Sequence, residues 1–279
     1  MTHLKKTWVC ICIGISTLSV AQDFNGIATY KSKQNFEMEI DTAQMQGMGS
    51  QIMDMLRKQF EKEFVLKFNQ YESLYTEDKE LEAPQPAGLV LTIEETGGAD
   101  HIYKNTKEKR YVNQSENFGK MFLIKDKLED LDWKLLNETK TIGEYTCYKA
   151  VLKREVMVME DQLLVNPSEN ENNEPKTELK EMEIVAWYTP QIPVNSGPDL
   201  FYGLPGLILQ VSSDDKTMIC SKLVLNPKSK VEIKEPVKGK VITQEKYRVV
   251  MEKKLKQIQE NRPEFGDGDG ESIEIRIGQ

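Results

Sequence analysis

Short segments in which apolar and polar residues alternate recur along most of this chain, and they constrain its fold more than any other feature. Alternation with a period of two places the apolar side chains on one face of a β-strand. Turn-forming residues separate most of the segments, which favours strands that reverse direction. The sequence therefore predicts a mostly antiparallel sheet, with strands near residues 24–31, 64–69, 72–76, 101–104, 110–113, 120–124, 145–158, 180–189, 207–212 and 218–224.

Two other stretches repeat apolar residues at helical spacing and predict the helices of an α+β fold. In residues 42–62 many of the apolar positions are methionines, with charged residues between them. A methionine stripe could line a groove for a soft metal or a partner, but methionine at this spacing is typical of core packing. Residues 243–261 carry apolar side chains on one helical face, and Asn261 and Pro263 are typical stop signals.

The N-terminus has the parts of an export signal. Two lysines precede the apolar residues 7–20, and Ala21 completes a small-x-small cleavage site. The apolar run is shorter than the roughly 20 residues that span a bilayer, so we expect no transmembrane anchor after cleavage. The sequence predicts a signal peptide over residues 1–21 and one exported domain, residues 22–279, in the periplasm, on the cell surface or secreted.

Charge and histidine content exclude several classes of function. The 279 residues include 45 acidic and 37 basic residues, which give a net charge of −8, and the basic residues form no stripe. A phosphate backbone would find no basic surface, so we expect no nucleic-acid partner. His3 and His101 are the only histidines, which excludes histidine-rich metal sites and leaves little for a histidine-dependent triad. We accordingly expect no metal or other cofactor.

The predicted exported domain retains two cysteines, Cys147 and Cys220, each in an alternating segment. Disulfides persist in exported proteins, and one pair on two strands is compatible with a cross-strand bridge. Two separately buried thiols, which behave as small apolar residues, are the alternative. A catalytic thiol needs a base or a cationic environment, and the surrounding sequence offers no signature of one.

Two low-complexity segments interrupt the strand pattern. Residues 166–175, NPSENENNEP, hold no apolar side chain outside their prolines and cannot offset their ordering entropy by burial. We expect a mobile insert there, within a hairpin. The tail near residues 266–271 is rich in glycine and acid, and its aspartates resemble a calcium loop. Ser272, however, stands where an EF-hand loop beginning at Asp267 needs glycine, which disfavours calcium.

One motif is more specific than the overall composition. It joins a tight turn to an apolar strand and consists of Gly203, Leu204, Pro205, Gly206, Leu207 and Ile208. Proline presets φ for the second position of a type II turn, and the following glycine tolerates the positive φ of the third. From its residues alone, the motif predicts a buried hairpin corner.

The same six residues spell the name motif of the GLPGLI family of exported Bacteroidetes proteins, which this chain resembles. Three flanking blocks, residues 132–140, 142–150 and 186–198, follow the order of that family. The close similarity covers residues 130–225, and a looser one extends over most of the predicted exported domain. The family is largely uncharacterised and is often encoded beside outer-membrane transport proteins.

This resemblance implies a single domain similar to the bowl-like N-terminal domain of certain secreted peptide N-glycosidases. The expected fold is therefore a curved sheet, bowl-like or half-barrel, with one helix in the N-terminal half and one at the C-terminus. In those enzymes the bowl-like domain is an accessory to a separate catalytic part. We therefore do not expect glycosidase activity here.

Aromatic side chains near the motif are the best candidates for ligand contacts, since rings combine a large apolar area with a polar edge. These candidates are Trp133, Trp187, Tyr188, Phe201 and Tyr202. Because Trp187 and Tyr188 are adjacent on one predicted strand, they should point to opposite faces of the sheet. At most one of them can line any one surface.

The sequence favours binding over catalysis. It has no Gly-x-Ser-x-Gly elbow, phosphate-binding glycine loop or His-Glu-x-x-His helix, and paired carboxylates are unremarkable among 45 acids. A lone His101 or a Ser–Lys pair are the catalytic alternatives. We predict a non-catalytic binding or envelope-assembly module for a peptide, a glycan or an outer-membrane partner. The alternatives are a periplasmic carrier of apolar cargo and a hydrolase without a recognisable motif.

Overall fold

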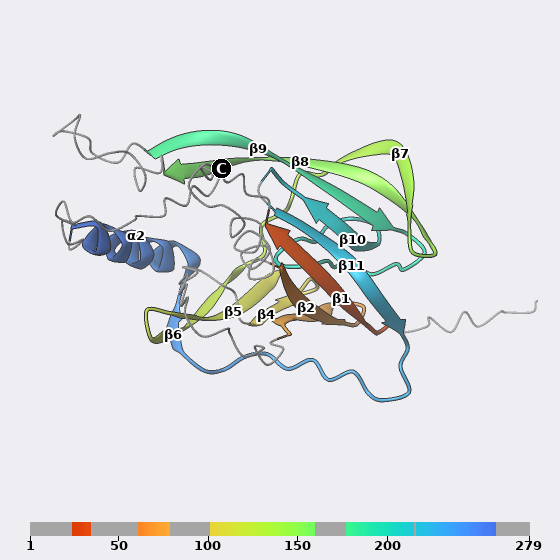
Figure 1. Ribbon diagram of the computed structural model, residues 1–279. Coiled ribbons are helices and arrows are strands. Elements are labelled where there is room, and N and C mark those ends of the chain that lie inside the picture. Colours follow the sequence, from red (N-terminus) through yellow and green to blue (C-terminus); the bar gives the residue numbers. More distant parts are fainter. Residues whose placement is uncertain (1–23, 35–60, 79–100, 160–176, 215, 261–279) are drawn as a thin grey trace, which may run out of the picture.

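The computed structural model describes residues 24–34, 61–78, 101–159, 177–214 and 216–260, which form one sheet and one helix (Figure 1). The strands are β1 Gly26–Gln34, β2 Glu61–Phe68, β3 Glu72–Glu77, β4 His101–Asn105, β5 Arg110–Asn117, β6 Lys120–Lys127, β7 Lys134–Ile142, β8 Tyr145–Met159, β9 Thr177–Thr189, β10 Leu207–Ser212, β11 Lys216–Leu225 and β12 Lys240–Ile242. The helix is α2, Gln244–Glu260.

The twelve described strands are ordered β12-β6-β5-β4-β3-β2-β1-β11-β10-β9-β8-β7. Neighbours pair antiparallel except β12, which runs parallel to β6. Figure 1 shows the sheet curled, with β7, β8 and β9 on one side, β2, β4, β5 and β6 on the other, and β1 and β11 between them. The predicted α+β fold with a curved, mostly antiparallel sheet is confirmed.

Some boundaries differ from the sequence predictions. The helix expected over residues 42–62 lies outside the described residues except for Glu61 and Lys62. These two begin β2, because they pair with β1 in the antiparallel ladder. Strands β7 and β12 were not predicted, since most of their side chains are exposed and show no clean alternation. The signal peptide, the insert at 166–175 and the tail near 266–271 also lie outside the described residues.

The connection between β9 and β10, residues 190–206, holds the curled sheet together. Its Ile192 and Val194 pack in a core cluster with side chains of β1 and β2. Leu204 packs with side chains of β8, β9 and β10, and Tyr202 packs in the cluster that α2 covers. One connection thus contributes to three clusters of the core, and its burial favours the curled shape over a flat sheet.

The turn predicted in the motif is wrong in detail. A type II turn would direct the Leu207 N–H to the Leu204 carbonyl. Instead that N–H donates to Ile192 O at 2.9 Å, and the Gly206 N–H donates to Leu204 O at 2.8 Å. Gly206 is nearly extended, with φ at 159°. It must be glycine because a Cβ there would lie 2.1 Å from Thr189 O.

Helix α2 matches the predicted C-terminal helix. Its Tyr247, Val250 and Met251 pack against the cluster that contains Phe122. The rings of Tyr247 and Phe122 meet edge to face, with centroids 5.3 Å apart. Asp126 Oδ2 accepts the Gln244 N–H at 3.0 Å, which satisfies one free amide at the helix start. The helix therefore covers the β6 end of the sheet.

Candidate functional site

All five aromatic candidates lie in core clusters or pack against them. Tyr188 and Tyr202 are buried, and Trp133 and Phe201 pack against the cluster that Leu204 forms with side chains of β8, β9 and β10. The indole N–H of Trp133 donates to Tyr202 O at 2.8 Å, and the Tyr202 hydroxyl donates to Glu129 O at 2.7 Å. Because the polar edges of Trp133 and Tyr202 are bonded to the main chain, these two rings stabilise the fold around residues 190–206.

Trp187 lies on the opposite face of β9 from Tyr188, as the sequence predicted. Its half-buried side chain packs against the core cluster that contains Ile192 and Val194. In the ladder it is directly opposite Lys149 of β8 and Gln210 of β10. Lys140 of β7 reaches over it, with Nζ 4.2 Å from the centre of the indole ring. The same Nζ donates to Gln210 Oε1 at 2.6 Å. Neighbouring strands therefore build one polar surface around a single aromatic ring.

Hydrogen-bonding side chains continue this surface toward β11. Gln210 Nε2 donates to Ser212 Oγ at 3.0 Å, and Thr217 Oγ1 lies 3.4 Å from the same hydroxyl. On the other side, Lys149 Nζ pairs with Glu138 at 2.9 Å. We call this surface the Trp187 face and define it by Lys140, Lys149, Trp187, Gln210, Ser212 and Thr217. The Gln210 amide and the hydroxyls of Ser212 and Thr217 can each donate and accept hydrogen bonds.

Lys140 is the unusual charge on the Trp187 face. Partial burial lowers the pKa of Lys140 below the ordinary value, and the nearby Cys147 opposes that shift. Its recorded contacts are the Gln210 carbonyl oxygen and the indole ring, and no carboxylate of the described residues pairs with it. The ring attracts the ammonium through its negative face but does not neutralise it. A partly desolvated positive charge thus remains at the surface.

Lys104 is a fully buried basic side chain of β4. It was not singled out from the sequence. Its Nζ donates to three main-chain carbonyls of the 190–206 connection, those of Gly197 at 2.7 Å, Asp199, and Phe201 at 3.2 Å. Burial lowers its pKa to about 7, while the Asp199 carboxylate favours the charged form. All three ammonium protons are bonded, so Lys104 acts as an anchor for this connection.

A sequence signal for Lys104 exists in the alternation of its strand. Ile102 and Lys104 share the face of β4 that points into the core, whereas His101 at the strand start is exposed. A lysine at an inward position of a short strand indicates a buried cation with a fixed partner. The partner itself could not be found, because main-chain carbonyls carry no residue signature.

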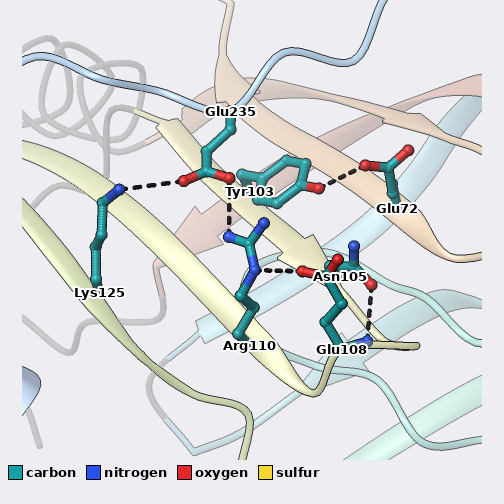
Figure 2. Close-up of polar contacts among 7 residues, drawn as sticks. All are labelled: Glu72, Tyr103, Asn105, Glu108, Arg110, Lys125 and Glu235. Carbon is teal, nitrogen blue, oxygen red and sulfur yellow. Dashed lines mark hydrogen bonds and ion pairs between the residues drawn. The ribbon is translucent and has the colours of Figure 1, made fainter.

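A second polar cluster lies where residues 226–239 cross β4, β5 and β6 (Figure 2). Arg110 pairs with Glu108 at 2.5 Å and with Glu235 at 2.8 Å, and Glu235 also pairs with Lys125 at 3.3 Å. Burial raises the pKa of Glu235, but these two cations outweigh it and lower that pKa below the ordinary value. We call Glu108, Arg110, Lys125 and Glu235 the Arg110 cluster.

Tyr103 joins the Arg110 cluster to the sheet. The guanidinium carbon of Arg110 lies 5.4 Å from the centre of the Tyr103 ring. The Tyr103 hydroxyl donates to Glu72 Oε1 at 2.5 Å, as Figure 2 shows. Burial, followed by this bond to a carboxylate, raises the pKa of Tyr103 to about 12. Each charge in the cluster has an opposite partner, so the cluster fastens the crossing segment to the sheet.

The two cysteines lie in the same core cluster, with Cys147 buried and Cys220 half-buried. Both are free thiols in the structure, and burial raises the pKa of each to about 11. A neutral thiol is a weak nucleophile and a poor metal ligand. The disulfide between them stays a prediction.

Neither a metal-binding group of side chains nor a membrane-spanning helix is found in the described part of the chain. No three histidine, cysteine, aspartate or glutamate side chains there are grouped as a metal site. Within the same residues, no helix is both long and apolar enough to cross a bilayer. The aspartates of the tail that resemble a calcium loop are not among them.

Comparison with known families identifies the segment that holds the motif. Residues 133–210 match the family described as a protein of unknown function (Porph_ging). This match confirms the resemblance predicted from the GLPGLI motif over these residues. The segment contains all of the Trp187 face except Ser212 and Thr217, together with the 190–206 connection. A comparison with curated proteins found no match.

Two crystal structures of PNGF-II are similar in structure to this chain. The structure in space group C2 has a TM-score of 0.45 and 14% sequence identity to this chain. The aligned part covers 82% of this chain and 33% of the PNGF-II chain. The structure in space group P21 has a TM-score of 0.46 and 15% identity, and covers 83% of this chain and 34% of its own. The chain therefore spans about a third of the length of the PNGF-II chains.

Proposed function

We propose that this protein is an exported, non-catalytic binding module of the cell envelope and that it binds a glycan on the Trp187 face. The observation that carries the proposal is the half-buried Trp187 ring beside the Gln210 amide and the Ser212 hydroxyl, which are hydrogen-bonded to each other. A sugar presents apolar C–H groups on one side and hydroxyls around its edge. An aromatic ring flanked by side chains that donate and accept hydrogen bonds is complementary to both.

The size and rigidity of the face also support an elongated ligand. From β8 to β11 there are three strand spacings, which together span about 14 Å. The side chains on this span project from paired strands whose register the ladder fixes. Groups held on strands need little reorganisation on binding, so less of the binding free energy is lost to ordering.

The buried nucleophiles favour a binding role over catalysis. Lys104 is fully buried beneath the main-chain carbonyls that it binds, and both thiols have a raised pKa. A nucleophile or general base needs an accessible lone pair near neutral pH, and these groups do not offer one. A peptide or an outer-membrane partner would use the same face and is an outcome of the tests below.

Calorimetric titration of residues 22–279 with a panel of envelope and extracellular polysaccharides tests the proposal. We expect Trp187→Leu to weaken binding of any glycan that binds by about tenfold or more, since stacking on a ring is worth on the order of 1–2 kcal/mol. The matched control is Tyr71→Leu, an exposed ring with Lys107 Nζ 5.5 Å from its centre, in the turn between β2 and β3.

Three results would contradict the proposal. They are no binding across the panel, equal binding by Trp187→Leu and the unmodified protein, and equal losses in Trp187→Leu and Tyr71→Leu. Export is tested separately, by fractionation of the native cell and N-terminal sequencing. Retention of residues 1–21 on a cytoplasmic protein would overturn the location. Crosslinking in the cell would show whether a protein partner occupies the Trp187 face instead.

A further inference from the structure

The basic side chains on the described strands differ in how their charge is compensated. Lys153 on β8 pairs with Glu181 at 2.6 Å, and Lys149 pairs with Glu138 at 2.9 Å. Arg110 has two carboxylates. Lys140 has none among the described residues, although partial burial makes its charge more costly than that of a fully solvated lysine.

The position of Lys140 directs this charge toward a ligand on the ring. Its Nζ is 4.2 Å from the Trp187 ring centre and 2.6 Å from Gln210 Oε1, so ring, amide and ammonium lie within one sugar unit of each other. The bond to Gln210 uses one of the three ammonium protons. An anion placed beside the ring would accept another, and charge-assisted hydrogen bonds are about twice as strong as neutral ones.

We propose that the glycan bound by the Trp187 face is acidic and that its sugar carboxylate pairs with Lys140 Nζ. This inference rests on the proposed function and adds the chemical class of the ligand. The carboxylate neutralises the one cation of the face that no described side chain compensates, while the sugar ring contacts the part of the half-buried Trp187 ring that stays exposed. Specificity for an acidic over a neutral glycan follows, because a neutral sugar leaves that charge unpaired.

The Glu138 carboxylate would repel an acidic ligand on the Trp187 face. Substituting Glu138 therefore gives a second, independent test. Its carboxylate holds Lys149, which lies opposite Trp187 in the ladder, so a ligand carboxylate meets one negative charge and one occupied cation. Glu138→Gln removes the repulsion and frees Lys149 for the ligand. An increase in affinity on mutation is a result that partial unfolding cannot produce.

The test compares two probes with one backbone, oligogalacturonate and its fully methyl-esterified form, in calcium-free buffer. Esterification masks each carboxylate and leaves the sugar rings and hydroxyls in place. We expect the acid to bind at least about tenfold more tightly than the ester at low salt, with a preference that falls as salt rises. Dextran sulfate, an anionic glycan that has no carboxylate, serves as a third probe and separates carboxylate recognition from general attraction to anions.

Three variants complete the measurement. Lys140→Met should abolish the preference for the acid and leave ester binding within about twofold, because stacking on Trp187 persists. Glu138→Gln should raise affinity for the acid alone. The control Lys153→Met removes a lysine of the same strand as Lys149 whose charge Glu181 already compensates, and it should change neither affinity.

The outcomes separate this inference from the proposed function. Equal binding of acid and ester, or a preference that survives Lys140→Met, overturns the acidic ligand and leaves glycan binding standing. Stronger binding of the sulfated probe in every variant also overturns it, since the attraction would then be unspecific. Absence of binding by both uronate probes together with binding of a neutral glycan has the same consequence. Binding of no glycan at all overturns both proposals.

Discussion

Two regions of this sheet place a cation over an aromatic ring, and they differ in what surrounds the cation. At the Arg110 cluster, the guanidinium lies 5.4 Å from the centre of the Tyr103 ring and is enclosed by Glu108 and Glu235. At the Trp187 face, Lys140 Nζ lies 4.2 Å from the ring centre and meets an amide. The same local contact therefore serves as a fastening in one region and leaves a charge available in the other.

The difference arises from the covering segment. Residues 226–239 cross the sheet at the Arg110 cluster and contribute Glu235, which lies 125 positions from Arg110 in the sequence. They also contribute Ile233, which packs on the cluster formed by Tyr103, Val112 and Leu123. At the Trp187 face the partners come from adjacent strands of the sheet. Arg110 becomes a structural fastening because a distant segment brings it a counter-ion, whereas neither a distant segment nor an adjacent described strand brings one to Lys140.

The largest expected effect comes from the connection that lies between the two regions. Gly206→Val should reduce the free energy of unfolding by more than about 3 kcal/mol, since its side chain would overlap the Thr189 main chain and force the backbone apart. Urea unfolding measures the change. Gly143→Ala is the control, because its φ is 59° with open space around it, and it should cost only about 1 kcal/mol. Equal losses would show that the contact at Thr189 does not explain the glycine.

Lys104→Met should be the next largest, with a loss of about 2 to 3 kcal/mol, because it leaves three carbonyls of the connection without donors. Thermal and urea unfolding at neutral pH measure it. Lys153→Met, at a well exposed lysine, should show no measurable change. A stable Lys104→Met variant would mean that hydrophobic packing alone holds residues 197–201.

The Arg110 cluster should contribute less, because its charges are partly solvated. A double-mutant cycle with Arg110→Met and Glu235→Gln should yield a coupling free energy of about 0.5 to 1 kcal/mol. The exposed pair Lys109 and Asp130, with side chains 62% and 79% accessible, is the control and should show no coupling. Similar values for both pairs would remove the distinction between a fastening and an ordinary surface ion pair.

Alkaline pH sharpens the same comparison through Tyr103. Its pKa in the folded protein is about 12, above the value near 10 of an unfolded chain. The folded state therefore retains a proton that the unfolded state loses, so this contribution is complete below pH 10 and is lost as pH rises from 10 to 12. We expect Tyr103→Phe to flatten the decline of stability over that interval. An unchanged slope would contradict the raised pKa.

The smallest effect on stability is expected at Lys140. Lys140→Met should leave the free energy of unfolding within about 0.5 kcal/mol of the original, since a partly desolvated cation without a carboxylate contributes little to the fold. Differential scanning calorimetry at two salt concentrations measures it. A loss as large as that of Arg110→Met would identify Lys140 as structural and would weaken its assignment to a ligand.

Sequence patterns predicted the sheet well because alternation reports directly on which side chains are buried. Strands β1 to β6 and the β8–β9 hairpin carry that alternation. Helix α2 carries the corresponding helical spacing of apolar residues. Strand β7 was missed, since it lies at the edge of the sheet and most of its side chains are exposed. The aromatic candidates stay a prediction as ligand contacts. Their degree of burial could not be told apart from the sequence, because a fully buried ring and a half-buried ring have the same local pattern.

The sequence by itself determined the alternating strands, the C-terminal helix, the opposite faces of Trp187 and Tyr188, and the need for glycine at position 206. These depend on neighbours within a few residues, whose geometry the backbone period dictates. Only the tertiary structure decided which cations are neutralised, that Lys104 binds three carbonyls, and why Gly206 is required. Those depend on contacts between segments far apart in the chain, and on the burial that makes an unpaired charge costly.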